Sequence, residues 1–421
     1  MKKQSIFFIG SLIACFLLTA CDNKTEDVAY ADLSIEQHKT KLQDDGMATL
    51  EKLDGMRDLS AISAVQDFMS IMNASSTPEA SLKKALTDVV SPIAQLNKKV
   101  LSLTKLDEQS ISMSELATLF NQNAGIYTYD PTNEAFVKTE SATTITYFFP
   151  IGASQTNNGK IIIDNFSEQL STNPERQDAF PKTLQIKLIK DNVNLFSFSW
   201  NATYNIDMIP TNLTANFSFK EGYEFNQNLT SSASTITWNM AYKLNNSTIL
   251  SSKFSTNGHF TYEDLSNAES SSIESLAAQV VNNGNAWVQL GNIKLTGIVD
   301  LINMKAAIDK AFPNDEVYDS EADTKKECEL LNKYIKLVVL YADENKAIAK
   351  SSFYSQEKTN GYWDYRNNRE IWIETTSYSP NMQLVFKDGS AMDESFFAQG
   401  FEDLQTAFSN MLTSFQTSPV Q

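Results

Sequence analysis

The sequence predicts an α+β protein in which N-terminal antiparallel helices and a C-terminal helix pack on a long, twisted antiparallel β-sheet. Apolar residues recur at steps of three and four in the first part of the chain and again near its end. Between these parts the period changes to two over several consecutive segments, which is typical of strands. The chain has 421 residues, of which 42% are hydrophobic, so it is long enough to bury a large core.

Residues 32–122 form the predicted helical segment. One helix is expected over about residues 34–56, and an apolar stripe at helical spacing follows, formed by Ile62, Val65, Phe68, Met69 and Met72. A further stripe runs through residues 82–103, where Pro92 predicts a kink or a break. These patterns predict three or four antiparallel helices at the start of the folded body.

Residues 123–421 form the predicted antiparallel-sheet body with its C-terminal helix, in one unit with the helical segment. The clearest strand is expected over residues 196–208, where every second residue is apolar. The pairs Asp191-Asn192 and Asn245-Asn246 lie between alternating runs, and asparagine tolerates the positive φ of a tight hairpin turn. We therefore expect an antiparallel meander with one aromatic face and one Asn/Ser/Thr face.

The last third of the chain is predicted to mix strands with helices. We expect a helix over residues 299–311 and strands over residues 287–295, 335–340, 348–354, 370–375 and 382–386. A continuous helical seam closes the pattern, formed by Phe397, Phe401, Leu404, Phe408, Met411 and Phe415. Asp393 is the expected N-cap of this last helix.

The first residues have the features of an export signal. Lys2 and Lys3 precede a short apolar run over residues 6–18, and Leu18-Thr19-Ala20-Cys21 follows directly. This segment resembles the lipobox of bacterial lipoproteins, and the chain is similar in make-up to Bacteroidota outer-membrane lipoproteins of unknown function. The resemblance implies a signal peptide over residues 1–20, a lipidated Cys21, and an outer-membrane location on the periplasmic face or the cell surface. Residues 21–31 are polar and acidic, which predicts a tether.

The charge balance excludes some partners. The chain carries 51 acidic and 34 basic residues, a formal net charge of −17, which repels nucleic acid and anionic membrane surfaces. The lipid on Cys21 is therefore the expected membrane attachment, rather than a basic patch. Cys328 would be the one thiol left after export and lipidation, and its helical surroundings favour a buried, inert side chain.

Little in the sequence points to catalysis. His38 and His259 lack the neighbouring residues of a zinc site or a Ser-His-Asp triad, and no cofactor-binding motif is found. Asp319, Glu321 and Asp323 alternate, but they lack the glycine and glutamate of a calcium loop and fit the start of a helix better. The sequence favours a non-enzymatic role and leaves a catalytic carboxylate pair open.

Aromatic residues are the remaining candidates for ligand binding. Trp200, Tyr204, Trp238 and Tyr242 share the inward phase of the meander, which is typical of a core but also fits an incompletely covered apolar groove. Trp363 belongs to the cluster Tyr362-Trp363-Asp364-Tyr365, which we expect in a turn after Gly361. There it either plugs the loop against its own domain or stacks on a sugar ring beside Asp364, Arg366 and Asn367.

Three functions follow as expectations. The first is a non-enzymatic binding or scaffold role at the outer membrane, with an envelope protein, a glycan or a lipid as partner. The second is a carrier of a hydrophobic ligand in an apolar groove between sheet and helices. The third is a glycan-acting hydrolase that uses a carboxylate pair. No oligomeric state is predicted.

Overall fold

The computed structural model describes residues 28–74, 120, 122–141, 143–170, 179–206, 209–261, 281–313, 320–366, 369–397 and 399–417. The chain falls into two compact units. Unit 1 comprises Met1–Asp45, Ala233–Ile236 and Ser252–Asp403, and unit 2 comprises Gly46–Ser232, Thr237–Ser251 and Leu404–Gln421. Both units combine helices with strands, which confirms the α+β class. The division of the chain at residues 122 and 123 stays a prediction.

The opening helices begin close to where the sequence places them. α2 covers Ile35–Asp54, a short 3-10 turn covers Gly55–Asp58, and α3 covers Ser60–Ala74. Of the predicted stripe on α3, the buried members are Ile62, Val65, Phe68 and Met72. The predicted stripe over residues 82–103 lies outside the described residues.

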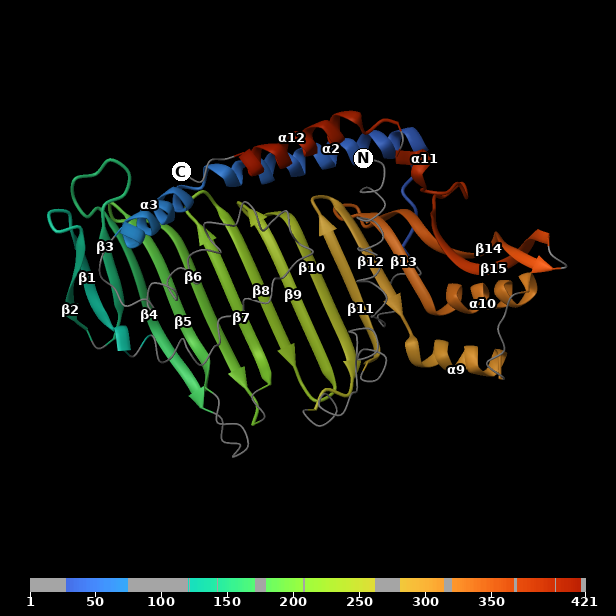
Figure 1. The fold of residues 1–421 in the computed structure, drawn as a ribbon, viewed down its shortest axis with the longest axis horizontal. Coiled ribbons are helices and arrows are strands. Elements are labelled where there is room, and N and C mark those ends of the chain that lie inside the picture. Colours follow the sequence, from blue (N-terminus) through green and yellow to red (C-terminus); the bar gives the residue numbers. More distant parts are fainter. Residues whose placement is uncertain are drawn as a thin grey trace. The chain divides into compact units, whose positions relative to one another are not determined.

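The strands of unit 2 follow one another in space almost as they do in sequence (Figure 1). They are β1 (Gly125–Asp130), β2 (Ala135–Glu140), β3 (Ile145–Phe149), β4 (Gly159–Leu170), β5 (Ala179–Lys190), β6 (Val193–Tyr204), β7 (Pro210–Phe219), β8 (Tyr223–Ser231) and β9 (Thr235–Leu244), of which Thr235 and Ile236 belong to unit 1. β3 to β8 pair antiparallel with their neighbours, as predicted. β1 differs, because it pairs antiparallel with β2 but parallel with β3.

The alternation in β6 has the predicted effect on its faces. Phe196 lies opposite Phe219 and Phe198 opposite Phe217, so aromatic residues share one face of the sheet. The strand ends at Tyr204 rather than continuing to residue 208, because Asn205 turns the chain. The Asn205 backbone N–H donates to the Ile209 carbonyl at 3.0 Å, and its side-chain oxygen accepts from the Ile209 N–H at 2.9 Å.

The predicted hairpin turns are confirmed. Asp191 and Asn192 have φ of 49° and 65°, and Asn245 and Asn246 have φ of 48° and 66°. These left-handed pairs match the twist of the strands that they join.

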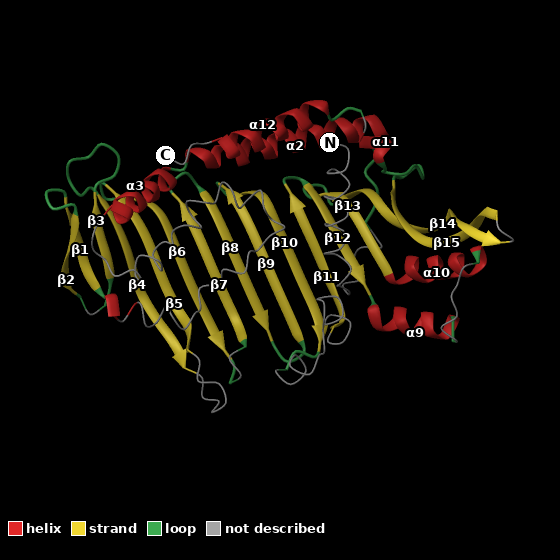
Figure 2. Ribbon diagram, viewed as in Figure 1, coloured by secondary structure: helices red, strands yellow, loops and turns green. Residues whose placement is uncertain are grey.

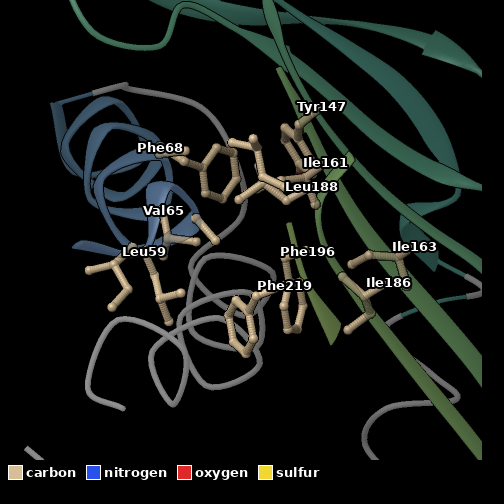
Figure 3. Close-up of a cluster of buried hydrophobic side chains, with 14 of the residues drawn as sticks. Leu59, Val65, Phe68, Tyr147, Ile161, Ile163, Ile186, Leu188, Phe196 and Phe219 are labelled. Atoms are coloured by element: carbon tan, nitrogen blue, oxygen red, sulfur yellow. The ribbon is translucent and has the colours of Figure 1, made fainter. Parts of the chain in front are cut away.

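The core of unit 2 forms where α3 meets the aromatic face of the strands (Figure 3). The Phe68 ring lies 5.4 Å from the Tyr147 ring and 4.9 Å from the Phe149 ring, and all three side chains are buried. Leu188 and Phe196 complete the packing from the neighbouring strands. α3 is therefore held by close aromatic contacts at this end of the sheet.

Unit 1 contains the second set of strands and two helices. These are β11 (Val281–Leu290), β12 (Ile293–Val299), α9 (Leu301–Ala311), α10 (Glu321–Tyr334), β13 (Ile335–Tyr341), β14 (Lys346–Arg366) and β15 (Arg369–Val385). β10 (Ser247–Gly258) contributes residues to both units. The prediction of one strand over residues 287–295 is wrong, because the chain turns at residues 291–292 and Leu290 pairs with Ile293.

The predicted continuous C-terminal helix is also interrupted. α11 covers Glu394–Phe397 and α12 covers Glu402–Thr417. Gly400 lies between them with φ of +86°, a left-handed conformation that cannot continue a helix. Within unit 2, Leu404 of α12 lies against Gly46 of α2.

Part of the predicted tether is folded into unit 1. The Ala31 N–H donates to the Ala347 carbonyl at 2.8 Å, and the Ala347 N–H donates to the Ala29 carbonyl at 2.9 Å. Val28 and Tyr30 pack against Val338, Leu340 and Ala347. Residues 28–31 are therefore part of the folded body, contrary to the prediction of a tether up to residue 31.

Candidate functional site

A long β-hairpin formed by β14 and β15, here called the arm, carries the most exposed aromatic side chains in the described part of the chain. Its register runs without a break from Lys350 opposite Val385 to Arg366 opposite Arg369. The sequence predicts three separate strands here, with Trp363 in a turn. That prediction is wrong, because β14 pairs with β15 without interruption from Lys350 to Arg366 and Trp363 lies within β14.

The base of the arm is fixed by α10, which lies alongside both strands (Figure 2). The Asn332 side-chain amide donates to the Phe353 carbonyl at 2.8 Å, and its oxygen accepts from the Phe353 N–H at 2.7 Å. This side chain thus takes the place of a neighbouring strand for one residue of β14. Leu331 and Phe353 also pack on a buried cluster that contains Val299 and Ile335.

The far end of the arm has a different surface. Tyr362, Trp363, Tyr365 and Trp372, here called the aromatic tip, are 51%, 65%, 66% and 47% exposed. Side chains alternate between the two faces of a strand, so Trp363 and Tyr365 lie on the same face of β14 as Phe353. Trp372, opposite Trp363, lies on this face too, whereas Tyr362 lies on the other. Three members of the aromatic tip, Trp363, Tyr365 and Trp372, therefore extend toward the hairpin turn the face that α10 covers at the base.

Two tryptophans of the aromatic tip form a cross-strand pair. Trp363 and Trp372 are directly opposite in the register, and their ring centroids are 5.2 Å apart with an angle of 63° between the ring planes. A β-carbon at Gly361 would overlap Cζ2 of Trp372, so this indole ring covers the glycine backbone. The two rings are held in place by each other and by the strand beneath them.

The other predicted ligand-binding aromatics belong to unit 2 and have contacts within the fold. Trp200 Nε1 and the Tyr204 hydroxyl both donate to the Pro181 carbonyl, each at 3.0 Å. Both side chains are half-buried, and burial raises the pKa of Tyr204. The structure brings these two predicted residues together, in contacts that fix the start of β5 against the end of β6.

Tyr242 and Trp238 lie on β9. The Tyr242 ring stacks on Tyr223 at 5.9 Å, and burial raises its pKa. The buried Tyr242 hydroxyl, like that of Tyr147, has no hydrogen-bond partner among the residues that the structure describes. Trp238 is half-buried. Trp238 and Tyr242 are thus at least half-buried, as the alternation predicts for side chains on the inward face of the meander.

The two histidines lie in different settings. His38 is 2% exposed, with Nδ1 2.9 Å from the Tyr341 hydroxyl, whereas His259 is exposed. Burial, and secondarily the charge of Lys41, lowers the pKa of His38. Glu321 and Asp323 lie in the first turn of α10, as expected for acids at a helix start. Across the described ranges, no cluster of three or more His, Cys, Asp or Glu side chains is arranged to hold a metal ion.

Cys328 lies on α10 and is buried, as the sequence predicts. Burial, and then the charge of Glu327, raises the pKa of its thiol. A thiol in this state is a poor nucleophile at neutral pH. The predicted lipidation site Cys21 lies outside the described residues.

Comparison with known families, with characterised proteins and with solved structures finds no match for this chain. No helix within the described residues combines the length and apolar character needed to cross a bilayer.

Sequence reasoning missed Trp372 as a candidate site residue. The sequence did contain an indication of it, because Asn367-Asn368 is the same residue pair as Asn245-Asn246, for which a hairpin turn is predicted. A hairpin predicted at this pair would have placed Trp363 opposite Trp372. The structure has this register, with Arg366 opposite Arg369.

Proposed function

We propose that this chain is a lipid-anchored cell-envelope lipoprotein with a non-enzymatic binding role, and that the aromatic tip is its binding surface. The observation that carries the binding role is the exposure of four Trp and Tyr side chains on one hairpin. Clustered exposed aromatics of this kind mark interaction sites in soluble proteins. Trp and Tyr also contribute large contact areas at low cost in conformational entropy.

The proposed anchor is the lipid on Cys21, which holds the protein on the outer membrane at its periplasmic face or at the cell surface. The resemblance of residues 18–21 to a lipobox supports it. Because residues 28–31 pack on β14, the proposed tether ends before residue 28. An anchored body of this kind would stay close to the membrane.

The anchor is tested by growing bacteria that express the full chain with a labelled fatty acid. We expect the label on the protein and the protein in the membrane fraction, with both lost in Cys21→Ser. Cys328→Ser is the matched control, because it removes the buried cysteine and leaves the lipobox intact. Retention of the label in Cys21→Ser would contradict the anchor.

The binding role is tested with an aromatic photo-reactive amino acid, which keeps a ring in place of the indole, at position 363 in the anchored protein. We expect crosslinks to an envelope component from this position. The control position is 302 on α9, where Ile302 is also exposed, at 51%. Equal crosslinking from both positions, or none from position 363, would contradict a binding role of the aromatic tip.

The proposed fold detail is that the N-terminal antiparallel helices and the C-terminal helix together cover the apolar face of the sheet. The aromatic contacts of Phe68 with Tyr147 and Phe149 support this for α3. Disulfide pairs introduced between the 82–103 segment and the apolar face of the unit 2 strands would test it for the remaining predicted helix. The proposal predicts that such pairs form without loss of the folded state.

A further inference from the structure

We infer that the aromatic tip binds a neutral glycan, by stacking of sugar rings on Trp363 and Trp372. This inference rests on the proposed binding role and names the class of ligand. A pyranose ring has apolar C–H faces and a polar rim, and its apolar face matches the π-face of an indole.

The geometry of the tryptophan pair suits such a ligand. The indole planes meet at 63° with their centroids 5.2 Å apart, so they form a corner rather than a flat surface. Both rings remain about half exposed or more, at 65% and 47%. The backbone of Gly361 supports Trp372 from below, which restricts the motion of that ring before any ligand arrives. A surface ordered in advance loses less entropy on binding.

The charge of this segment argues for a neutral ligand. Between Gly361 and Ile373 the sequence has two acidic and two basic residues, so their formal charges cancel. The whole chain, in contrast, carries −17. The segment therefore attracts neither anions nor cations strongly, while the field of the whole chain repels anionic polymers.

The same charges argue against insertion of the hairpin into a lipid bilayer. A hairpin that entered the hydrocarbon would carry four ionisable residues with it, and ionisable side chains are costly there. Exposed Trp and Tyr also occur at membrane interfaces, so the test includes binding to lipid vesicles as a comparison. The test must also distinguish glycan binding and membrane binding from a third role, in which the tryptophan pair only stabilises the hairpin.

The test uses the full-length lipoprotein purified from membranes. The probes are soluble oligosaccharides of glucose, mannose and xylose in α and β linkages, measured by calorimetry up to about 10 mM. Oligogalacturonate is the anionic comparison, and vesicles of neutral phosphatidylcholine are the membrane comparison. The variants are Trp363→Ala, Trp372→Ala and the conservative Trp363→Phe, with Ile302→Ala as an exposed control elsewhere in unit 1.

We expect at least one neutral oligosaccharide to bind, with affinity reduced about tenfold or more by either alanine variant. Trp363→Phe keeps an aromatic ring and is expected to retain most of the affinity. If the tryptophan pair only stabilised the hairpin, affinity for a sugar would not depend on a ring at position 363. Thermal unfolding checks that every variant is folded. Ile302→Ala is expected to bind like the wild type.

Three results would overturn the inference: no binding of any neutral oligosaccharide, equal binding by the alanine variants, or preferential binding of oligogalacturonate or vesicles. The proposed binding role is tested separately, by the crosslinks from position 363. If crosslinks form from position 363 but no oligosaccharide binds, the aromatic tip serves another partner and only the glycan assignment falls.

Discussion

The Nδ1 atom of His38 lies 2.9 Å from the hydroxyl oxygen of Tyr341, and the two rings are nearly parallel at a centroid distance of 5.8 Å. The contact joins α2 to β13, and the Phe386 ring lies 5.6 Å from the imidazole on another side. Lys41 lies over the Tyr341 ring and pairs with Glu344. A neutral imidazole is favoured here, because the site is buried and the nearest charge on α2 is positive.

This contact predicts that acid destabilises unit 1. The pKa of His38 is lowered in the folded state, whereas an unfolded histidine titrates near about 6.5. Below that pH the unfolded chain binds more protons than the folded one, so the free energy of unfolding decreases until the folded pKa is reached. Above it the contribution is fully present. Urea unfolding at several pH values between about 7.5 and 5.5 measures the effect.

The matched variants for this prediction are the two histidines of the chain. His38→Gln is expected to be less stable at neutral pH but to lose less of its stability on acidification. His259→Gln, at an exposed position, is expected to keep the pH dependence of the wild type. An identical pH dependence in His38→Gln and wild type would exclude His38 as the source.

Truncation of Phe68 is expected to destabilise unit 2 severely. Its ring is fully buried against Tyr147, Phe149 and Phe136, so Phe68→Ala leaves a cavity and should cost about 3–5 kcal/mol in the free energy of unfolding. Phe408→Ala on α12 is the control, because that side chain is 40% exposed. The control is expected to cost about 1 kcal/mol or less. Equal effects in urea unfolding would show that Phe68 is not central to the core.

The arm is expected to loosen at its base when Asn332 is changed. Asn332→Asp keeps an acceptor for the Phe353 N–H but removes the donor to the Phe353 carbonyl. We expect a loss of about 1–3 kcal/mol in the local stability of β14, seen as faster hydrogen exchange around Phe353. Lys333→Ala, at the exposed neighbouring position, should leave that exchange unchanged. Unchanged exchange in Asn332→Asp would mean that packing alone holds the base.

Gly361 is expected to control the geometry of the tryptophan pair. A β-carbon there overlaps Trp372, so Gly361→Ala displaces the indole from its position against Trp363. Because the displaced ring is exposed, we expect the free energy of unfolding to change by about 1 kcal/mol or less. The exciton signal of the paired indoles in circular dichroism should decrease.

Two substitutions calibrate that measurement. Trp372→Phe is expected to abolish the exciton signal, because it removes one indole of the pair. Trp238→Phe removes an indole outside the pair and should leave the signal in place. A full signal in Gly361→Ala would contradict the tight contact between the glycine and the ring.

Local features of this protein follow from the sequence because they depend on neighbouring residues. The helical stripe on α3, the alternation of β6 and the turns at Asn192 and Asn246 are all confirmed. Periodicity specifies which face is apolar, and asparagine specifies where the backbone can take positive φ. Gly400 also indicates the break between α11 and α12. The apolar pattern continues at helical spacing on both sides of this glycine, so the sequence predicts one helix instead.

Features that depend on distant pairings were decided by the tertiary structure. The sequence predicted Trp363 in a turn, whereas its pairing with Trp372 extends both strands and keeps the two rings exposed. His38 became a buried residue only through contacts with Tyr341, 303 residues away in the chain, and with Phe386, which is still further away. A period shows which side chains share a face, but burial depends on whether another part of the chain covers that face, and no local pattern contains that information.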